Sequence, residues 1–184
     1  MKRNQNCPEI KPYNLLAPEI DSTEFAESII NAHGQEEWHM GLLTYQLHGH
    51  WGIYSLLGAK MGLYARELSL FSGKVERVIS SAGQLPPLSC FNDGLQVSTG
   101  ATLGNGRILL GQGPFSVSAH FNFNHHSFTL ALQPSLNRQL LRKIDKIKST
   151  CSGSTYWRAI EHLSMIFWLR WNRKSIFDIE KIES

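Results

Sequence analysis

Two histidines separated by one glycine are the residues of this chain best suited to chemistry. His48 and His50 lie in the segment 47–52 (LHGHWG). Side chains at positions i and i+2 of a helix point about 200° apart, so the two imidazoles can converge only in a turn or at a helix end. Gly49 supplies the backbone freedom for such a turn. An imidazole lone pair is available at pH 7 and suits zinc, nickel or iron, so the pair could bind a metal. The simpler interpretation is two turn histidines with solvent or backbone partners.

A cysteine and an aspartate further along the chain can complete that site. Cys90 and Asp93 lie in the segment 90–94 (CFNDG). Two histidines with a distant Cys and Asp make an open metal site, which keeps one position for water or substrate. Simpler interpretations compete, since a free cysteine is commonly a small buried hydrophobe and Asp93 can cap the helix that it opens. Asp93 can also hold a ligand histidine in the right tautomer.

The two segments resemble the signature blocks of the FmdE-like family of formylmethanofuran dehydrogenase proteins. Residues 48–61 (HGHWGIYSLLGAKM) are similar to a block that reads HGH, an apolar residue, Cys-Pro-Gly and a later glycine. Residues 90–106 (CFNDGLQVSTGATLGNG) are similar to the block C-x-x-D-A-I-Q-x-x-T-G-x-T-x-G-K-G. The resemblance covers residues 38–135, with a weaker match of residues 176–179 to the closing strand of the family.

The resemblance implies metal ligation by His48 and His50, with Cys90 as a third, thiolate ligand and zinc as the most suitable divalent transition metal. Gly52 stands where the family has the cysteine of Cys-Pro-Gly, so we expect no chemistry that needs a nucleophilic sulfur at that position. Many family members also carry a C-terminal zinc ribbon with two CxxC pairs. The chain has three cysteines, which is too few for that ribbon.

Composition indicates one ordinary domain. The chain has 184 residues, of which 42% are hydrophobic and 18% charged, enough to bury a core. A net charge of +3 does not indicate a nucleic-acid partner. We find no signal-peptide pattern and no run as long as a membrane span. We interpret the three cysteines as unpaired, which predicts a reducing compartment and a cytoplasmic protein.

The pattern of elements predicts a single α+β domain over residues 21–184, preceded by an extended N-terminal arm over residues 1–20. The resemblance implies an α-β-α-β-β-β core shared in outline with the catalytic domain of glyceraldehyde-phosphate dehydrogenase. Helices should pack on a small mixed sheet, with the histidine turn at one end. We expect helices at 21–32, 36–46, 53–70, 93–99, 135–148 and 155–171, and strands at 75–81, 107–111, 115–123, 127–132 and 176–179.

The expected strand at 115–123 has a polar face that contains His120. Such a face is usually solvated, but if it lines the cleft, His120 could donate a proton or contact substrate. We therefore take His120 and Asp93 as candidate catalytic residues. The segment 104–107 (GNGR) lacks the strand-loop-helix order and the lysine of a phosphate-binding loop, so we interpret it as a turn.

The expected helix at 155–171 has a broad, tryptophan-rich face. It could pack on its own domain, on a second subunit or on an anionic membrane. Because the face is larger than a small domain readily hides, we expect a soluble homodimer. The basic run 142–148 (RKIDKIK) is interpreted as a solvated helix face.

Two functions are compatible with these residues. The family resemblance implies a metal-binding accessory factor of a molybdenum or tungsten oxidoreductase, or a factor that handles its metal or cofactor. The alternative is a small metal-dependent enzyme, in which the ion acts as a Lewis acid on a carbonyl and His120 or Asp93 moves the proton.

Overall fold

The computed structural model describes residues 23–69 and 74–183, so the arm expected at 1–20 lies outside the described residues. Helices and strands follow one another along the chain in nearly the order that the hydrophobic pattern predicts. In chain order the elements are α1 (Thr23–His33), α2 (Gln35–His48), α3 (Ile53–Leu68), β1 (Arg77–Ser80), the 3₁₀ turn η1 (Leu88–Cys90), α4 (Phe91–Thr99), β2 (Ile108–Leu110), β3 (Ser118–Asn122), β4 (Ser127–Leu132), α5 (Pro134–Thr150), α6 (Gly153–Arg170), α7 (Arg173–Ile176) and β5 (Phe177–Glu183).

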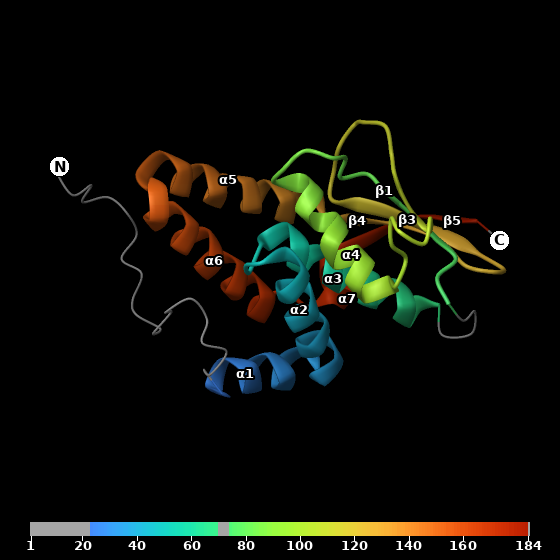
Figure 1. Ribbon diagram of the computed structural model, residues 1–184, viewed down its shortest axis with the longest axis horizontal. Coiled ribbons are helices and arrows are strands. Elements are labelled where there is room, and N and C mark those ends of the chain that lie inside the picture. Colours follow the sequence, from blue (N-terminus) through green and yellow to red (C-terminus); the bar gives the residue numbers. More distant parts are fainter. Residues whose placement is uncertain (1–22, 70–73, 184) are drawn as a thin grey trace.

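The fold is a single α+β domain with helices packed on a small mixed sheet, as predicted. The strand order is β2-β1-β3-β4-β5. Only β1 and β2 run parallel among the described strand pairs, and the other neighbours are antiparallel. Figure 1 shows the sheet toward one end of the molecule, with α1, α2, α5 and α6 toward the other. Alternate strand residues such as Val78, Phe121 and Leu130 are fully buried, in one core cluster with Met61 of α3 and Leu95 of α4.

Helices α3 and α4 touch through their backbones. A Cβ atom added at Gly58 of α3 would collide with the carbonyl oxygen of Phe91, and one added at Gly94 of α4 would collide with that of Ser55. Glycine is therefore required for this approach, because any side chain at either position would push the helices apart. The contact sets the first turn of α4 against the first turn of α3, and thus beside the histidine turn.

The tryptophan-rich face of α6 is buried within the chain itself. Trp168 is 1% exposed and stacks on Trp38 with ring centroids 5.4 Å apart, and Trp171 is 8% exposed. Trp157 is the exposed member, at 58%. The expectation that this face is too large for one domain is therefore wrong, because α1, α2 and α3 supply the surfaces that cover it. The homodimer stays a prediction, but the size of the tryptophan-rich face no longer supports it.

The two cysteines in the described residues differ in their bonding, although we expected unpaired thiols. Cys90 is free and half-buried, whereas Cys151 is disulfide-bonded, so the expectation is wrong for Cys151. The cysteines therefore give no argument for a reducing compartment. Among the described residues, no helix combines the length and apolar character needed to cross a membrane.

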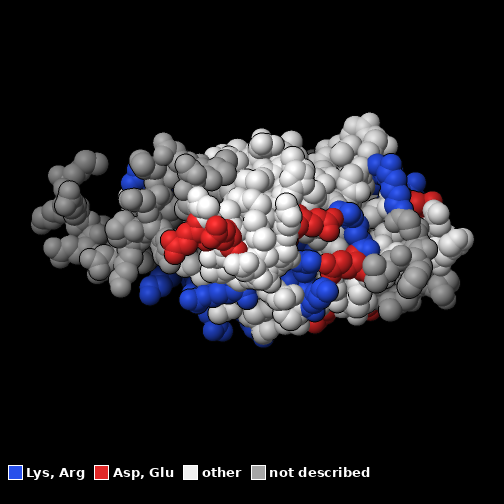
Figure 2. All heavy atoms as spheres, turned by 90° about the horizontal axis from the view of Figure 1, so that it is seen from below, with Lys and Arg blue, Asp and Glu red and all other residues white. Residues whose placement is uncertain are grey.

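Charged groups on one face of the molecule are mixed in sign. Figure 2 shows acidic and basic side chains next to one another on this face. An exposed pair of this kind joins Arg66 of α3 to Glu36 of α2 at 3.0 Å. Exposed pairs contribute little to stability, because water and salt screen them.

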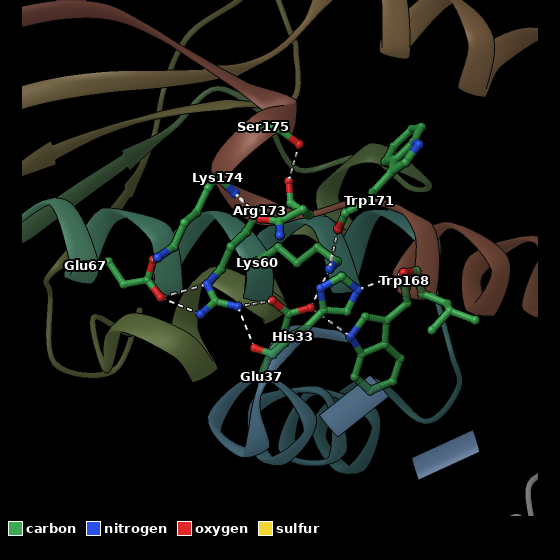
Figure 3. A network of polar contacts seen from close by, with 11 residues as sticks. His33, Glu37, Lys60, Glu67, Trp168, Trp171, Arg173, Lys174 and Ser175 are labelled. Carbon is green, nitrogen blue, oxygen red and sulfur yellow. Dashed lines mark hydrogen bonds and ion pairs between the residues drawn. The ribbon is translucent and has the colours of Figure 1, made fainter. Parts of the chain in front are cut away.

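A buried ionic network joins α2 to α3, α6 and α7 (Figure 3). Glu37 and Lys60 are each 2% exposed and are ion-paired. The Glu37 carboxylate also accepts hydrogen bonds from Arg173 Nη1 at 2.6 Å and from Trp168 Nε1 at 3.1 Å. Lys60 Nζ donates a second bond to the Trp171 carbonyl oxygen at 2.7 Å. Burial lowers the pKa of Lys60 to about 8, although the Glu37 carboxylate opposes that shift.

Glu37→Gln should lower the free energy of unfolding by about 3 kcal/mol, because it leaves Lys60 buried without a counter-charge. Lys60→Met is the matched comparison, since Glu37 keeps Arg173 and Trp168 as partners. We expect it to cost less than half as much. Urea unfolding followed by circular dichroism at neutral pH measures both variants. Equal losses would show that the carboxylate is not the centre of the network.

Candidate functional site

The histidine pair lies in the turn between α2 and α3, as its spacing predicts. His48 is the last residue of α2, and Gly49 ends the helix with a φ of 87°, in the left-handed region that favours glycine. The Gly49 amide donates to the Tyr45 carbonyl oxygen at 2.7 Å. The turn brings the rings of His48 and His50 together, with centroids 4.3 Å apart.

Asp93 binds His48 and does not cap its own helix. His48 Nδ1 and Asp93 Oδ2 are 2.7 Å apart. Helix α4 begins earlier than expected, at Phe91, with Cys90 as its N-cap residue and no side-chain capping bond. Asp93 therefore lies within the first turn of α4, where its carboxylate faces the histidine turn. The capping expectation is wrong, and the expectation that Asp93 orients a histidine is consistent with this contact.

The two histidines differ in charge. The hydrogen bond that the His48 ring donates to Asp93 and the interaction with Cys90 raise the pKa of His48 to about 9, and burial opposes this shift. Burial lowers the pKa of His50, and the neighbouring His48 charge lowers it further. At neutral pH the metal-free site thus holds a protonated ring next to a neutral one. The Cys90 thiol lies close enough to interact with the His48 ring.

The donors of the site suit a soft divalent metal in their chemistry. His48 Nε2 is buried without a hydrogen-bond partner, while Nδ1 is held by a carboxylate, which is how metal-ligating histidines are commonly supported. Cys90 is a free thiol beside that ring. Within the described residues, however, no group of three or more His, Cys, Asp or Glu side chains is arranged to hold a metal ion. His48 and Cys90 thus offer suitable donor atoms, but the described side chains do not form a ligand set.

Gly52, which stands where the family's first block has a cysteine, lies beside the His48 ring. A Cβ atom added at Gly52 would lie 3.0 Å from His48 Nε2 and 2.9 Å from Ser55 Oγ. A cysteine at this position would therefore lie next to the His48 ring, which together with Ser55 would have to shift slightly to admit it. The glycine leaves that side of the His48 ring without a thiolate.

His120 is not brought to the histidine turn. Its neighbours Ala119 and Phe121 are fully buried in the core between the sheet and the helices. Because side chains alternate along a strand, His120 lies on the outer face of the sheet. There its Nδ1 is 3.0 Å from Thr129 Oγ1 of the neighbouring strand.

Tyr54 is a residue near Cys90 that spacing did not single out. Tyr54 is 9% exposed, and burial raises the pKa of its hydroxyl, with smaller contributions from Asp145, Cys90 and Tyr156. Tyr54 stands where the family block has the glycine of Cys-Pro-Gly, which is the one sequence signal that could have drawn attention to it. Asp145 of α5 and Tyr156 of α6 carry no such signal, because only the fold brings their helices to this place.

The second family block forms a structural turn after α4. Asn105 Oδ1 accepts hydrogen bonds from the amides of Thr102 at 2.9 Å and Arg107 at 3.1 Å. Arg107 Nη1 donates to the Val75 carbonyl oxygen at 3.0 Å. The polar groups of this segment are used within the chain, which confirms that it is a turn.

The protein is thus a small α+β domain with a candidate site at the turn between two helices. The site consists of an imidazole bound to an aspartate, beside a free thiol. The family model described as "FmdE, Molybdenum formylmethanofuran dehydrogenase operon" matches residues 47–148. The chain belongs to this FmdE family. The matched part contains His48, His50, Cys90 and Asp93. No protein with a curated description matches the chain.

In metal-free protein, Asp93→Asn should lower the pKa of His48 from about 9 toward the ordinary 6.5, because Asp93 is the largest cause of the shift. A raised pKa stabilises the fold fully below pH 6.5, and the contribution is lost as the pH rises through 9. The stability advantage of the unsubstituted protein over Asp93→Asn should therefore shrink over this window. NMR titration of the histidine rings and urea unfolding measure the two effects. Asp145→Asn is the control, and a His48 pKa that stays high in Asp93→Asn would refute the assignment.

Proposed function

We propose that this protein is a metal-binding accessory factor, which assists a molybdenum or tungsten oxidoreductase or handles its metal or cofactor. The observation that carries the proposal is the state of His48, whose Nδ1 is held by Asp93 and whose Nε2 is buried without a partner. The family description supports the link to such an enzyme, since it names the formylmethanofuran dehydrogenase operon. The extension to a physical partner of this chain is part of the proposal.

Zinc is the metal that these donors would suit, with His48 and Cys90 as ligands and His50 as the third. A bound zinc ion would supply Lewis acidity. Asp93 positions the His48 ring and fixes which nitrogen faces the ligand site. The half-buried thiol of Cys90 faces the same ring from the start of α4.

The alternative is a small metal-dependent enzyme that acts on a carbonyl compound. Asp93 is the group that could move a proton there, since it lies beside His48. His120 on the outer face of the sheet is too poorly placed for that role. Genes next to this one separate the two functions, because oxidoreductase or metal-transport genes favour the accessory factor and a metabolic operon favours the enzyme.

The purified, untagged protein should bind about one zinc ion per chain. His48→Ala should abolish binding, because it removes the buried ligand. Gly52→Cys, combined with Ser55→Ala to make room for the Cβ atom, should tighten binding roughly tenfold or more by adding a thiolate. Elemental analysis and competition with a chromophoric chelator measure the stoichiometry and the affinity.

His125→Ala is the matched control, since His125 is exposed in the turn between β3 and β4. It should leave the zinc affinity unchanged. Absence of zinc from both native and reconstituted protein would exclude the proposed site. The same conclusion would follow if neither His48→Ala nor the Gly52→Cys variant altered affinity.

We also propose a homodimer in solution. Leu47 and Trp157 are each 58% exposed and lie next to the histidine turn, Trp157 through an edge contact with His50 at 6.1 Å. Burying these side chains against a second copy would remove apolar surface from water.

Light scattering at micromolar concentration should report twice the chain mass. Trp157→Lys should shift the protein toward the monomer, because it places a charge in the proposed interface. Leu103→Lys, at a side chain that is 60% exposed on a loop, is the control and should leave the mass unchanged. A monomeric mass for the unsubstituted chain would contradict the proposal.

A further inference from the structure

The outer face of α5 is the most strongly basic surface that a single element of the described chain provides. Its 17 residues include five cations and one carboxylate, so α5 alone carries more positive charge than the net +3 of the whole chain. All five cations are exposed. They are Arg138, Arg142, Lys143, Lys146 and Lys148.

None of these cations forms an ion pair in the described part of the chain, and Asp145 is the one carboxylate that α5 itself provides. The ion pairs there use other basic residues, such as Arg66, Arg173 and Lys174. A basic group left unpaired on a fixed surface attracts anions over about a Debye length, roughly 8 Å at physiological salt. The α5 cations therefore differ from the exposed Arg66, whose charge is paired with Glu36.

The row of charges is held at a regular spacing. Arg138, Arg142 and Lys146 follow one another at i, i+4 and i+8, which places them about 6 Å apart along one side of the helix. The opposite side of α5 is anchored in the core by Leu140, Ile144 and Ile147, all of them buried. Figure 1 shows α5 along the edge of the molecule, next to α6. The row is thus a rigid, accessible feature.

We propose that the outer face of α5 docks an acidic peptide segment of a partner protein. A helix with carboxylates at every fourth position repeats the spacing of the row, so each cation would meet one carboxylate. An anionic membrane fits less well, because the apolar side of α5 is already used by the core and Leu141, at 43% exposure, is its one exposed large apolar residue. Nucleic acid also fits less well, since α5 contains no aromatic residue on which a base could stack.

The docking face adjoins the candidate site without overlapping it. Asp145, the one carboxylate of α5, lies close enough to Tyr54 to act on its hydroxyl, and Cys90 does the same from the site. A peptide along α5 would therefore bring its protein next to the histidine turn while the ligands of the turn stay free. Docking at α5 uses none of the metal-site residues and does not depend on a bound metal.

The test uses the full chain and a fluorescein-labelled helical peptide with glutamate at every fourth position, at about 0.15 M salt. We expect saturable binding that weakens as salt is raised. Arg142→Glu with Lys146→Glu should weaken it at least about tenfold, by replacing two attractions with repulsions. Lys74→Glu with Arg77→Glu is the matched control, with the same change in net charge at two exposed residues away from α5. It should change the affinity less than about twofold.

Circular dichroism checks that each variant folds, and Arg142→Gln with Lys146→Gln gives a milder change with an intermediate loss expected. Zinc binding should be the same in all of these variants, so a failed docking face and a failed metal site are told apart. Equal losses in the α5 and control variants would overturn the proposal, as would no binding of the peptide. Tighter binding of phosphatidylserine vesicles or duplex DNA than of the peptide would also overturn it, in favour of another anion.

Discussion

The contact between the backbones of α3 and α4 is the constraint on which the candidate site depends. Gly58 and Gly94 allow the two helices to touch, since a Cβ atom at either position would meet a backbone oxygen of the other helix. The contact places the start of α4, with Cys90 and Asp93, beside the start of α3. Since α3 begins directly after the histidine turn, residues far apart in the chain become neighbours. Without this approach, the His48 ring would lose both its carboxylate and its thiol.

The site that results is asymmetric in charge. Asp93 and Cys90 favour the protonated form of His48, whereas burial and the adjacent charge favour the neutral form of His50. A metal bound by His48 would have to displace a proton, since ligation needs the lone pair. The carboxylate that raises the pKa also holds the ring in the orientation that a ligand needs. The same bond thus favours the proton in the free site and orients the ring for a metal.

Charged residues of this domain fall into two groups, those paired in the interior and those exposed at the surface. The pair of Glu37 and Lys60 lies in the interior and joins α2 to α3, with Arg173 completing it from α7 (Figure 3). Removal of the Glu37 carboxylate from this network would be costly, because it leaves Lys60 buried without a counter-charge. The cations of α5 lie at the surface and form no ion pair within the described residues. Buried ion pairing therefore joins α2 and α3, the two helices that flank the histidine turn. The charges of α5, in contrast, are exposed to solvent.

The sequence by itself determined the class of fold, the order of the elements and the turn that carries His48 and His50, because periodicity and glycine positions act locally. The two blocks also indicated the family. Only the tertiary structure decided what each face meets. Asp93 binds His48 rather than capping α4, His120 faces away from the helices, and the tryptophans of α6 are covered by the same chain. Alternation along a strand or helix shows which residues share a face, but the partner of that face is set by packing between segments distant in sequence.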